Sequence, residues 1–305
     1  MTKHVLMPMC LAVAVAGTAT AAQTVRLPDY LCGGSQGIFA DGYETGGVFS
    51  SDPSMGSGGA YPGNHSRSFP FAVLGTQTYY LHVPPQYQSG QAMPVMLVLE
   101  GYTGSHASSV LEAQGMRDAW VGPADTYGFI VAVPVNNKWN GSWLPADGSG
   151  QTNDYDAIGA ALDDLGQAYN IERNRVSVWG FSAGGHIAWD MLLNNGAFVR
   201  PTPLNAGTLA SMSTSGANSQ FACNDTVATC GARFAALPRK VPVDIHIGNS
   251  DPNYAWTGDD YQRLLTNGWV YGKNLSYTLF VGGHTYMASH LVQVAGFACR
   301  YALQP

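Results

Sequence analysis

The chain has 305 residues, of which 46% are hydrophobic and only 11% are charged, against about 25% charged residues in an average soluble domain. The net charge is -6 and Lys and Arg are scattered, which excludes the basic patch that a nucleic acid or an anionic membrane surface requires. The 37 Gly and 17 Pro follow neither a collagen-like period nor a heptad repeat, so the composition excludes fibrous and coiled-coil proteins and indicates one compact, loop-rich domain.

Residues 1–22 have the pattern of a secretory signal peptide. Lys3 precedes an apolar stretch at residues 5–16, and the segment ends in Ala19-Thr20-Ala21, the small-residue pattern that signal peptidase cuts. The apolar stretch is shorter than the roughly 20 residues that span a bilayer. We therefore expect a secreted or periplasmic protein that no longer contacts a membrane once the signal is removed.

Residues 23–63 are predicted to form an N-terminal arm, and residues 64–305 the catalytic domain. From residue 33 to residue 63 the arm is dominated by Gly, Ser, Asp and Tyr, with no apolar period. The rest of the chain has no internal repeat and no second domain boundary.

Short apolar runs bounded by Gly, Pro or Asn predict buried strands in the catalytic domain. They cover residues 78–83, 95–99, 129–135, 176–179, 241–247 and 275–281. Helical patterns are found at residues 108–120, 155–169, 183–193, 259–265 and 287–301. Because strands and helices alternate, we expect an α/β fold with a mostly parallel central sheet and helices on both faces.

The fourth predicted strand leads into Gly-Phe-Ser-Ala-Gly at residues 180–184, and a helix follows. A strand, Gly-x-Ser-x-Gly and a helix in this order form a nucleophile elbow, a strained turn that exposes the serine hydroxyl at the carboxyl edge of the sheet. Gly180 and Gly184 fit because a side chain there would strike the neighbouring strand or helix. Ser182 is therefore the predicted nucleophile, and the alternative is a serine that only occupies a turn.

A serine nucleophile needs a base and an orienting carboxylate, which in this kind of site follow in the order Ser, Asp or Glu, His. Asp251 lies in the loop after the strand at residues 241–247, and His284 lies in the loop after the strand at residues 275–281. Both are expected at the same sheet edge as Ser182. We predict His284 as the base and Asp251 as the acid that orients it, whereas the alternative for His284 is a surface loop histidine.

His186 is the other histidine near the elbow. It follows Ser182 by four residues and precedes Asp190 by four, a spacing that would place His186 beside Asp190 on one helix. A metal site would need a third ligand, and none is evident, so a hydrogen-bonded helix histidine is preferred.

Two backbone N–H groups are predicted to form the oxyanion hole. One is that of Ala183, which follows the nucleophile, and the helix dipole there favours negative charge. The second is expected from the loop after the strand at residues 95–99, where Tyr102 is the predicted donor and Gly101 shapes the turn.

Aromatic side chains on the loops at this edge are predicted to bind the substrate. They are Trp139, Trp143, Trp256 and Tyr286, together with Tyr102. Such a surface suits a polymer chain, a phenolic ring or a sugar. The alternative is that about half of these rings cover the core instead.

Four cysteines remain once the signal peptide, with Cys10, is removed. An even number in an exported chain predicts two disulfides, and three pairings are possible. The simplest closes the short loop between Cys223 and Cys230 and pairs Cys32 with Cys299. The C-x-x-C spacing of a zinc site is absent, so no metal is predicted.

Taken together, these motifs resemble the secreted polyhydroxybutyrate depolymerase and feruloyl esterase-like branch of the α/β-hydrolases. The resemblance covers about residues 78–300 and rests on Tyr-Asn-Ile at 169–171, Arg-Val at 175–176, residues 180–185, residues 248–251 and Gly-His-Thr-Tyr at 283–286. It implies an α/β-hydrolase fold and hydrolysis of a carboxylic ester through an acyl-enzyme, with no cofactor. One departure is Glu100-Gly101, where the family has His-Gly, because a carboxylate there would oppose the oxyanion unless it is turned away or paired.

The sequence therefore predicts a secreted serine ester hydrolase, of the polyester-depolymerising type or a related esterase, whose partner is an ester substrate. Alternatives are a feruloyl or acetylxylan esterase acting on plant cell wall, a peptidase or amidase, and a binding protein without activity on the same fold. The complete set of Ser182, Asp251 and His284 favours an enzyme over a binding protein.

Overall fold

The computed structural model describes residues 23–26, 51–72, 74–137, 140–143, 153–193, 204–223 and 227–304. The predicted signal peptide and residues 27–50 of the predicted arm lie outside these ranges, as do Trp139 and Cys32. Within the described residues, no helix is both long enough and apolar enough to cross a bilayer.

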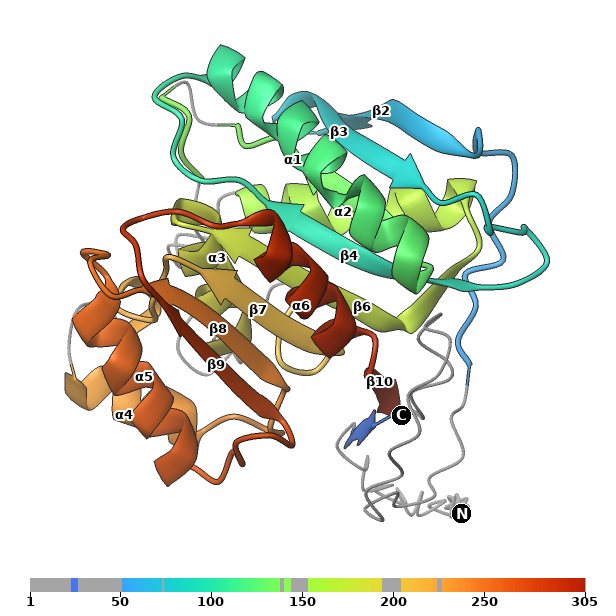
Figure 1. Ribbon diagram of the computed structural model, residues 1–305. Helices are drawn as coiled ribbons and strands as arrows, with labels where there is room; N and C mark the ends of the chain where they lie inside the picture. Colours follow the sequence, from blue (N-terminus) through green and yellow to red (C-terminus); the bar gives the residue numbers. More distant parts are fainter. Residues whose placement is uncertain are drawn as a thin grey trace, which may run out of the picture.

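A central sheet runs through the molecule (Figure 1), with the strand order β2-β3-β5-β4-β6-β7-β8-β9. β2 and β3 are antiparallel to their neighbours, whereas every adjacent pair from β5 to β9 is parallel. The mostly parallel sheet is thus confirmed. The strands are β2 (Gly63–Phe71), β3 (Gly75–Val83), β4 (Met93–Leu99), β5 (Ile130–Pro134), β6 (Ile171–Phe181), β7 (Ser211–Ser215), β8 (Val243–Gly248) and β9 (Leu275–Phe280).

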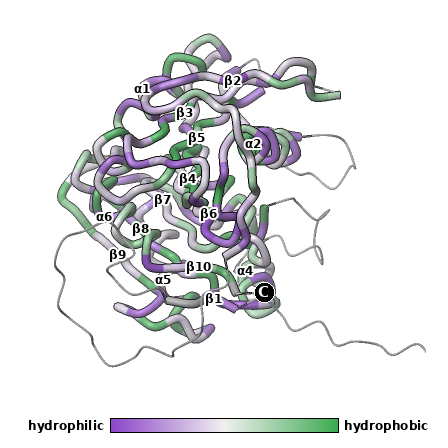
Figure 2. The backbone as a smooth tube through the Cα atoms, turned by 90° about the vertical axis from the view of Figure 1, so that its right-hand side faces the viewer, coloured by the Kyte–Doolittle hydropathy of each residue, from purple (hydrophilic) through white to green (hydrophobic). Residues whose placement is uncertain are grey.

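Helices cover both faces of this sheet, as predicted (Figure 1). On one face, α1 (His106–Tyr127) and α6 (Ala288–Ala298) pack Trp120 and Leu291 into a cluster with Trp179 of β6. The opposite face and its larger core are covered by α2 (Asp154–Ala168), α3 (Ala183–Leu193), α4 (Val227–Ala235) and α5 (Tyr254–Thr266). In Figure 2 the hydrophobic stretches gather in central strands such as β4 and β5, which are buried along almost their whole length.

Several elements differ from the sequence-based predictions. The helix predicted for residues 287–301 ends at Ala298, because residues 301–304 instead form β10 (Tyr301–Gln304), which pairs with β1 (Gln23–Arg26) in a separate two-stranded sheet. α5 begins at Tyr254 rather than at residue 259. β2, β7 and α4 were not predicted at all, since none of the three contains a clear apolar run.

The described end of the predicted arm, residues 51–62, packs beside the amino end of β6. The N–H of Ser54 donates to the carbonyl of Ile171 at 2.8 Å, and its hydroxyl donates to the carbonyl of Tyr169 at 2.8 Å. A Cβ on Gly59 would lie only 2.3 Å from the Tyr169 ring, so the arm lies tightly against the domain there. Ser182 follows the opposite end of β6, which means that residues 51–62 leave it uncovered.

The predicted disulfide between Cys223 and Cys230 is confirmed. It joins the short helix η2 (Phe221–Cys223) to α4 and is completely buried. Cys299 is also disulfide-bonded. Its predicted partner, Cys32, lies outside the described residues, so the second predicted pairing stays a prediction.

Candidate active site

Ser182 lies in the turn between β6 and α3 with a φ of +52°, the left-handed region that side chains other than glycine rarely adopt. The strained turn that the motif predicts is thus present. The turn is held at both ends, because the N–H of Ser182 donates to the carbonyl of Ser215 at 3.0 Å and its carbonyl accepts the N–H of His186 at 3.0 Å. The surrounding structure therefore stabilises a conformation that costs of order 1–3 kcal/mol by itself.

The two glycines of the motif are in tight contact with backbone atoms, as predicted. A Cβ on Gly180 would lie 2.3 Å from the carbonyl oxygen of Gly184. One on Gly184 would lie 2.3 Å from the carbonyl oxygen of Leu99 and 2.5 Å from that of Glu100. The start of α3 is therefore seated directly on the carboxyl end of β4, which brings the loop after β4 beside Ser182.

The structure brings Ser182, Asp251 and His284 together from three different loops. Nε2 of His284 lies 2.8 Å from Oγ of Ser182, and Nδ1 lies 2.8 Å from Oδ2 of Asp251. With Nδ1–H donated to the carboxylate, Nε2 is left as the acceptor for the serine proton. The His284 side chain is 34% exposed, whereas that of Asp251 is fully buried, so the chain of hydrogen bonds runs from the surface inward.

Asp251 is fixed by residues that the sequence analysis did not single out. Its Oδ1 accepts the N–H of Asn253 at 2.8 Å. The amide of Asn253 donates to the carbonyl of Gly216 at 2.9 Å and accepts from Nδ2 of Asn218 at 2.9 Å. Asn253 thus joins the loop after β8 to the loop after β7. The signal in the sequence was the Asp-Pro-Asn turn itself, in which a side chain commonly bonds to the backbone two residues on.

Gly216 forms the wall behind the histidine. Its φ is +62°, and a Cβ there would lie 3.1 Å from Nδ1 of His284 and 3.2 Å from Oδ2 of Asp251. Only glycine combines this backbone conformation with that close approach. On its other side, the His284 ring lies 5.1 Å from the ring of Phe181. The imidazole is therefore confined between β7 and the elbow.

One predicted oxyanion donor, Ala183, lies in the elbow, and the other, Tyr102, lies in the loop after β4. Ala183 is the first residue of α3, and neither its N–H nor that of Tyr102 donates to any other described residue. Gly101 brings the loop after β4 against the nucleophile, since a Cβ on it would lie 3.3 Å from Cβ of Ser182. Both N–H groups thus remain available for a ligand on the Ser182 side of the loop.

Glu100 is turned into the protein interior. Its side chain is completely buried, and its Oε1 accepts Nδ2–H of Asn136 at 2.6 Å and the N–H of Asn136 at 3.2 Å. Burial raises the pKa of this carboxyl from its ordinary value of 4.5 to about 8, although hydrogen bonds from Asn136 and the hydroxyl of Ser109 lower it. The group is therefore a neutral carboxylic acid at pH 7, and the predicted conflict with the oxyanion is absent at that pH.

The predicted aromatic surface is only partly present. Trp143 is 3% exposed and donates its indole N–H to the carbonyl of Glu100 at 2.8 Å, so it belongs to the core and not to a surface. Trp256 is half-buried beneath the guanidinium of Arg263, at 4.9 Å from its ring. Tyr286 packs edge-on against Phe181, with ring centroids 5.0 Å apart. Tyr102 is the exposed ring at 62%, and Trp139 lies outside the described residues.

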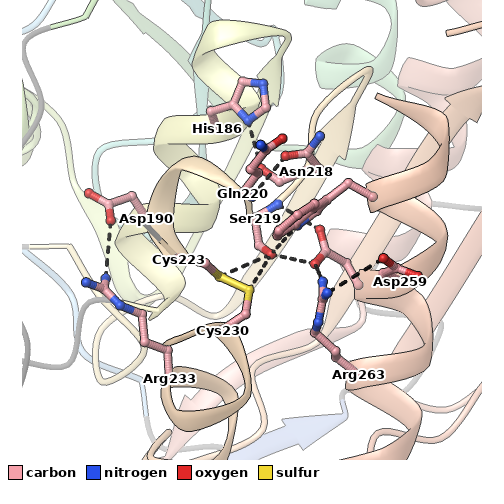
Figure 3. Close-up of a disulfide and its surroundings, with 12 residues drawn as sticks. His186, Asp190, Asn218, Ser219, Gln220, Cys223, Cys230, Arg233, Asp259 and Arg263 are labelled. Atoms are coloured by element: carbon pink, nitrogen blue, oxygen red, sulfur yellow. Dashed lines mark hydrogen bonds and ion pairs between the residues drawn. A yellow bond between two sulfur atoms is a disulfide. The ribbon is translucent and has the colours of Figure 1, made fainter. Parts of the chain in front are cut away.

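The loop after β7 is anchored beside the disulfide (Figure 3). There Oγ of Ser219 lies between Cys230 and the buried carboxylate of Asp260, whose pKa is raised to about 6 by burial. Trp256 also donates to this hydroxyl, at 3.3 Å. The disulfide and α5 thus hold the segment that carries Asn218 and Gly216.

His186 and Asp190 have separate partners, contrary to the spacing argument. Nδ1 of His186 donates to the carbonyl of Asn218 at 2.8 Å, and burial lowers its pKa, so it is the hydrogen-bonded helix histidine that was preferred. Asp190 points away from it toward Arg233, with which it pairs at 3.8 Å, as Figure 3 shows. Among the residues that the structure describes, no group of His, Cys, Asp or Glu side chains is arranged to hold a metal ion.

Comparison with known proteins gives similarity of fold alone. No family model and no curated protein matches the sequence. A ferulic acid esterase matches in structure with a TM-score of 0.54 and 17% identity, over 78% of this chain and 97% of that one. An S-formylglutathione hydrolase from Staphylococcus aureus has a TM-score of 0.54 at 16% identity, over 79% and 98% of the two chains. A poly(3-hydroxybutyrate) depolymerase from Bordetella parapertussis has a TM-score of 0.50 at 16% identity, over 77% and 89%. The fold is therefore that of the α/β-hydrolases.

Proposed function

We propose that this chain is a serine hydrolase of carboxylic esters with Ser182 as nucleophile, His284 as base and Asp251 as the acid that orients the base. The observation that carries the proposal is the unbroken chain of hydrogen bonds from Ser182 through His284 to Asp251, two contacts of 2.8 Å each. The strained turn at Ser182 adds support, because non-glycine residues with positive φ concentrate at functional sites.

The arrangement accounts for both halves of an acyl transfer. Oγ of Ser182 attacks the ester carbonyl while its proton passes to Nε2 of His284, and the N–H groups of Ala183 and Tyr102 stabilise the tetrahedral oxyanion. When the C–O bond breaks, Nε2 returns that proton to the leaving alkoxide, and the acyl group stays on Ser182. A water then gives a proton to His284, attacks the acyl-enzyme and releases the acid, and the proton goes back to Oγ. Asp251 keeps the tautomer of His284 fixed throughout.

A polyester of the polyhydroxyalkanoate type is the substrate class we favour. Exposed apolar side chains stand on the segments that follow four different strands at the carboxyl edge of the sheet, which suits an extended apolar chain better than a small charged molecule. They are Tyr102, Phe221, Tyr254, Val281 and Met287. The structurally similar poly(3-hydroxybutyrate) depolymerase is consistent with this choice, and the ferulic acid esterase makes a plant cell-wall ester the alternative.

Export of the protein belongs to the same proposal. The buried disulfide between Cys223 and Cys230 supports an oxidising compartment, since such bonds are rare in the cytosol. Residues 1–22 then act as the signal peptide, and the mature chain is secreted or periplasmic.

The test is release of product by the mature protein from p-nitrophenyl butyrate, polyhydroxybutyrate particles and methyl ferulate. We expect Ser182→Ala to lose at least about a thousandfold in kcat/KM, because catalysis without the nucleophile falls to the level that binding and the oxyanion hole supply. Ser250→Ala is the matched control, since Ser250 is an exposed serine on a neighbouring loop at the same edge, and it should stay within about twofold of wild type.

Retention of activity by Ser182→Ala, or turnover of amides but of no ester, would refute the proposed function. Among the three esters, the one with the highest kcat/KM identifies the substrate class. A preference for methyl ferulate over the polymer would replace the polyester with the cell-wall alternative.

A further inference from the structure

Glu100 occupies a position where an ionised carboxylate would be harmful to the proposed reaction. It lies between β4 and Gly101, and its own carbonyl oxygen would be 2.5 Å from a Cβ on Gly184. The nucleophile turn, the loop of Tyr102 and the Glu100 backbone therefore form one packed unit. The developing negative charge of the tetrahedral intermediate would lie against this unit, and because the Glu100 side chain is completely buried, bulk water does not screen a charge on it.

Burial is what favours the neutral form of the Glu100 side chain, because the hydrogen bonds from Asn136 and Ser109 lower its pKa and burial outweighs them. Both donors from Asn136 converge on Oε1, while Oε2 is buried without a hydrogen-bond partner in the described part of the chain. No Lys, Arg or His among the described residues forms an ion pair with it. A bare carboxylate oxygen in this place would be strongly disfavoured, and a proton on Oε2 removes the charge.

Glu100 connects segments that surround the site, through its side chain to Asn136 and through its backbone carbonyl to Trp143. Asn136, which Glu100 binds, lies just beyond β5 and donates its second Nδ2 hydrogen to Oγ of Ser109 on α1 at 2.7 Å. Trp143, from the next segment, donates to the Glu100 carbonyl at 2.8 Å. The loop of Tyr102 is itself tied to this region, because the N–H of Thr103 donates to the carbonyl of Gly141 at 3.0 Å. Glu100 is thus the buried link between the predicted oxyanion loop and the end of β5.

We propose that Glu100 is a positioning residue that works as a neutral acid: it holds the Tyr102 loop against the end of β5, and its ionisation at alkaline pH opposes the oxyanion and lowers the rate. This inference rests on the ester hydrolysis proposed above. The pKa of about 8, raised chiefly by burial and also by the neighbouring carboxylate of Glu112, places the loss just above neutral pH. The effect belongs to kcat, because the opposed charge develops only in the transition state.

Other ionisable groups lie near Glu100 and the Tyr102 loop, and a test must distinguish their effects on the rate from that of Glu100. Glu112 and His106 come from α1, and Nδ1 of His106 donates to the carbonyl of Asn136 at 2.9 Å. Asp154, at the start of α2, accepts Nδ2–H of Asn137 at 2.6 Å. Tyr286 approaches from the loop after β9, and burial raises its pKa. Of these, Glu112 is the carboxylate with a direct electrostatic effect on Glu100, which makes it the natural control.

The experiment measures kcat and KM for p-nitrophenyl butyrate between pH 6 and pH 10, with buffer hydrolysis subtracted, for wild type, Glu100→Gln and Glu112→Gln. The kcat of wild type should fall about tenfold between pH 7 and pH 9.5, and the midpoint of this fall should lie near pH 8. This loss is smaller than the one that removal of an oxyanion donor causes. Glu100→Gln should lose less than about twofold over the same range, because an amide cannot ionise. Glu112→Gln should keep an alkaline loss, with a midpoint at or below that of wild type.

A wild-type profile that stays flat to pH 10, or an alkaline loss of the same size and midpoint in Glu100→Gln, would overturn the inference. If Glu100→Gln does not fold, Glu100→Met supplies a neutral, unbranched replacement for the same comparison.

A second readout does not depend on esterase activity. Because the folded-state pKa is raised from 4.5 to about 8, the stability that this group contributes is complete below about pH 4.5 and is lost as the pH rises through 8. The Tm of wild type relative to Glu100→Gln should therefore fall from pH 5 to about pH 8 and level off above it. A Tm difference that is independent of pH would show that Glu100 is not held neutral. If wild type cleaves no ester but the Tm difference falls as expected, the proposed function fails while the protonation of Glu100 stands.

Discussion

Gly184→Ala is the sharpest test of how the elbow is seated on the sheet. The new methyl group would lie 2.3 Å from the carbonyl oxygen of Leu99 and 2.5 Å from that of Glu100, where ordinary contacts begin at 3.4 Å. Both obstacles are backbone atoms, so α3 and the end of β4 must separate by about 1 Å, an overpacking that costs about 1–3 kcal/mol of stability. A displacement of that size between nucleophile and oxyanion donors reduces the rate by about a hundredfold.

The matched control is Gly115→Ala, because Gly115 is also helical but has no atom within 4 Å of an added Cβ. It should be stabilised by about 0.5–1 kcal/mol, the usual gain of alanine over glycine inside a helix, with unchanged turnover of p-nitrophenyl butyrate. Urea unfolding gives the stabilities and initial rates give kcat for both variants. Gly184→Ala with wild-type kcat and wild-type stability would refute the idea that this contact sets the geometry of the site.

Two further perturbations act on the loops that hold the acid of the triad. Asn253→Ala removes the two side-chain hydrogen bonds that join the loop of Asp251 to the loop after β7. Urea unfolding should therefore show a loss of about 1–3 kcal/mol in stability, and initial rates should show a lower kcat with little change in KM. An unchanged kcat would count against a positioning role. The double variant Cys223→Ala with Cys230→Ala opens a loop whose ends are seven residues apart, and its free energy of unfolding should be about 2–3 kcal/mol lower than that of wild type in thermal or urea unfolding. Equal stability of wild type and the double variant would contradict the structural role of the disulfide.

Sequence patterns located most clearly the strands whose side chains are almost all apolar. β4 and β5 are buried at nearly every position and consist of Val, Met, Leu, Ile and Ala with one Pro each, so their short apolar runs are unambiguous. β10 could not be found in this way, because residues 301–304 become a strand only through pairing with residues 23–26, almost the whole chain away. A local pattern carries no information about a partner at that distance.

In the candidate site, too, some residues can be identified from local sequence, whereas others depend on contacts that form only in the folded chain. Chain order and the position of each residue after a strand were enough to choose Ser182, Asp251 and His284, because parallel strands bring their carboxyl ends to one edge. The state of Glu100 could not be predicted from the sequence, since it depends on burial and on Asn136, which bonds the carboxyl only in the folded chain. For the same reason Trp143 was predicted to be a substrate contact although its indole is used inside the core.

β7 is the strand on which the geometry of the triad most depends, although its sequence, Ser-Met-Ser-Thr-Ser, contains a single apolar residue. It is nevertheless fully buried, and two of its hydroxyls bond to β6: Oγ of Ser211 donates to Oγ of Ser177 at 2.8 Å, and Oγ of Ser215 accepts the indole N–H of Trp179 at 3.1 Å. β7 lies between β6, which ends at the nucleophile, and β8, which leads to the acid. The ends of β6 and β8 are therefore two strand spacings apart, each of about 4.8 Å. The imidazole of His284, with 2.8 Å contacts on both sides, fills that gap, because the residue after β7 is Gly216, which has no side chain to occupy it. A bulkier side chain after β7 would keep every residue of the triad and still prevent the triad from forming.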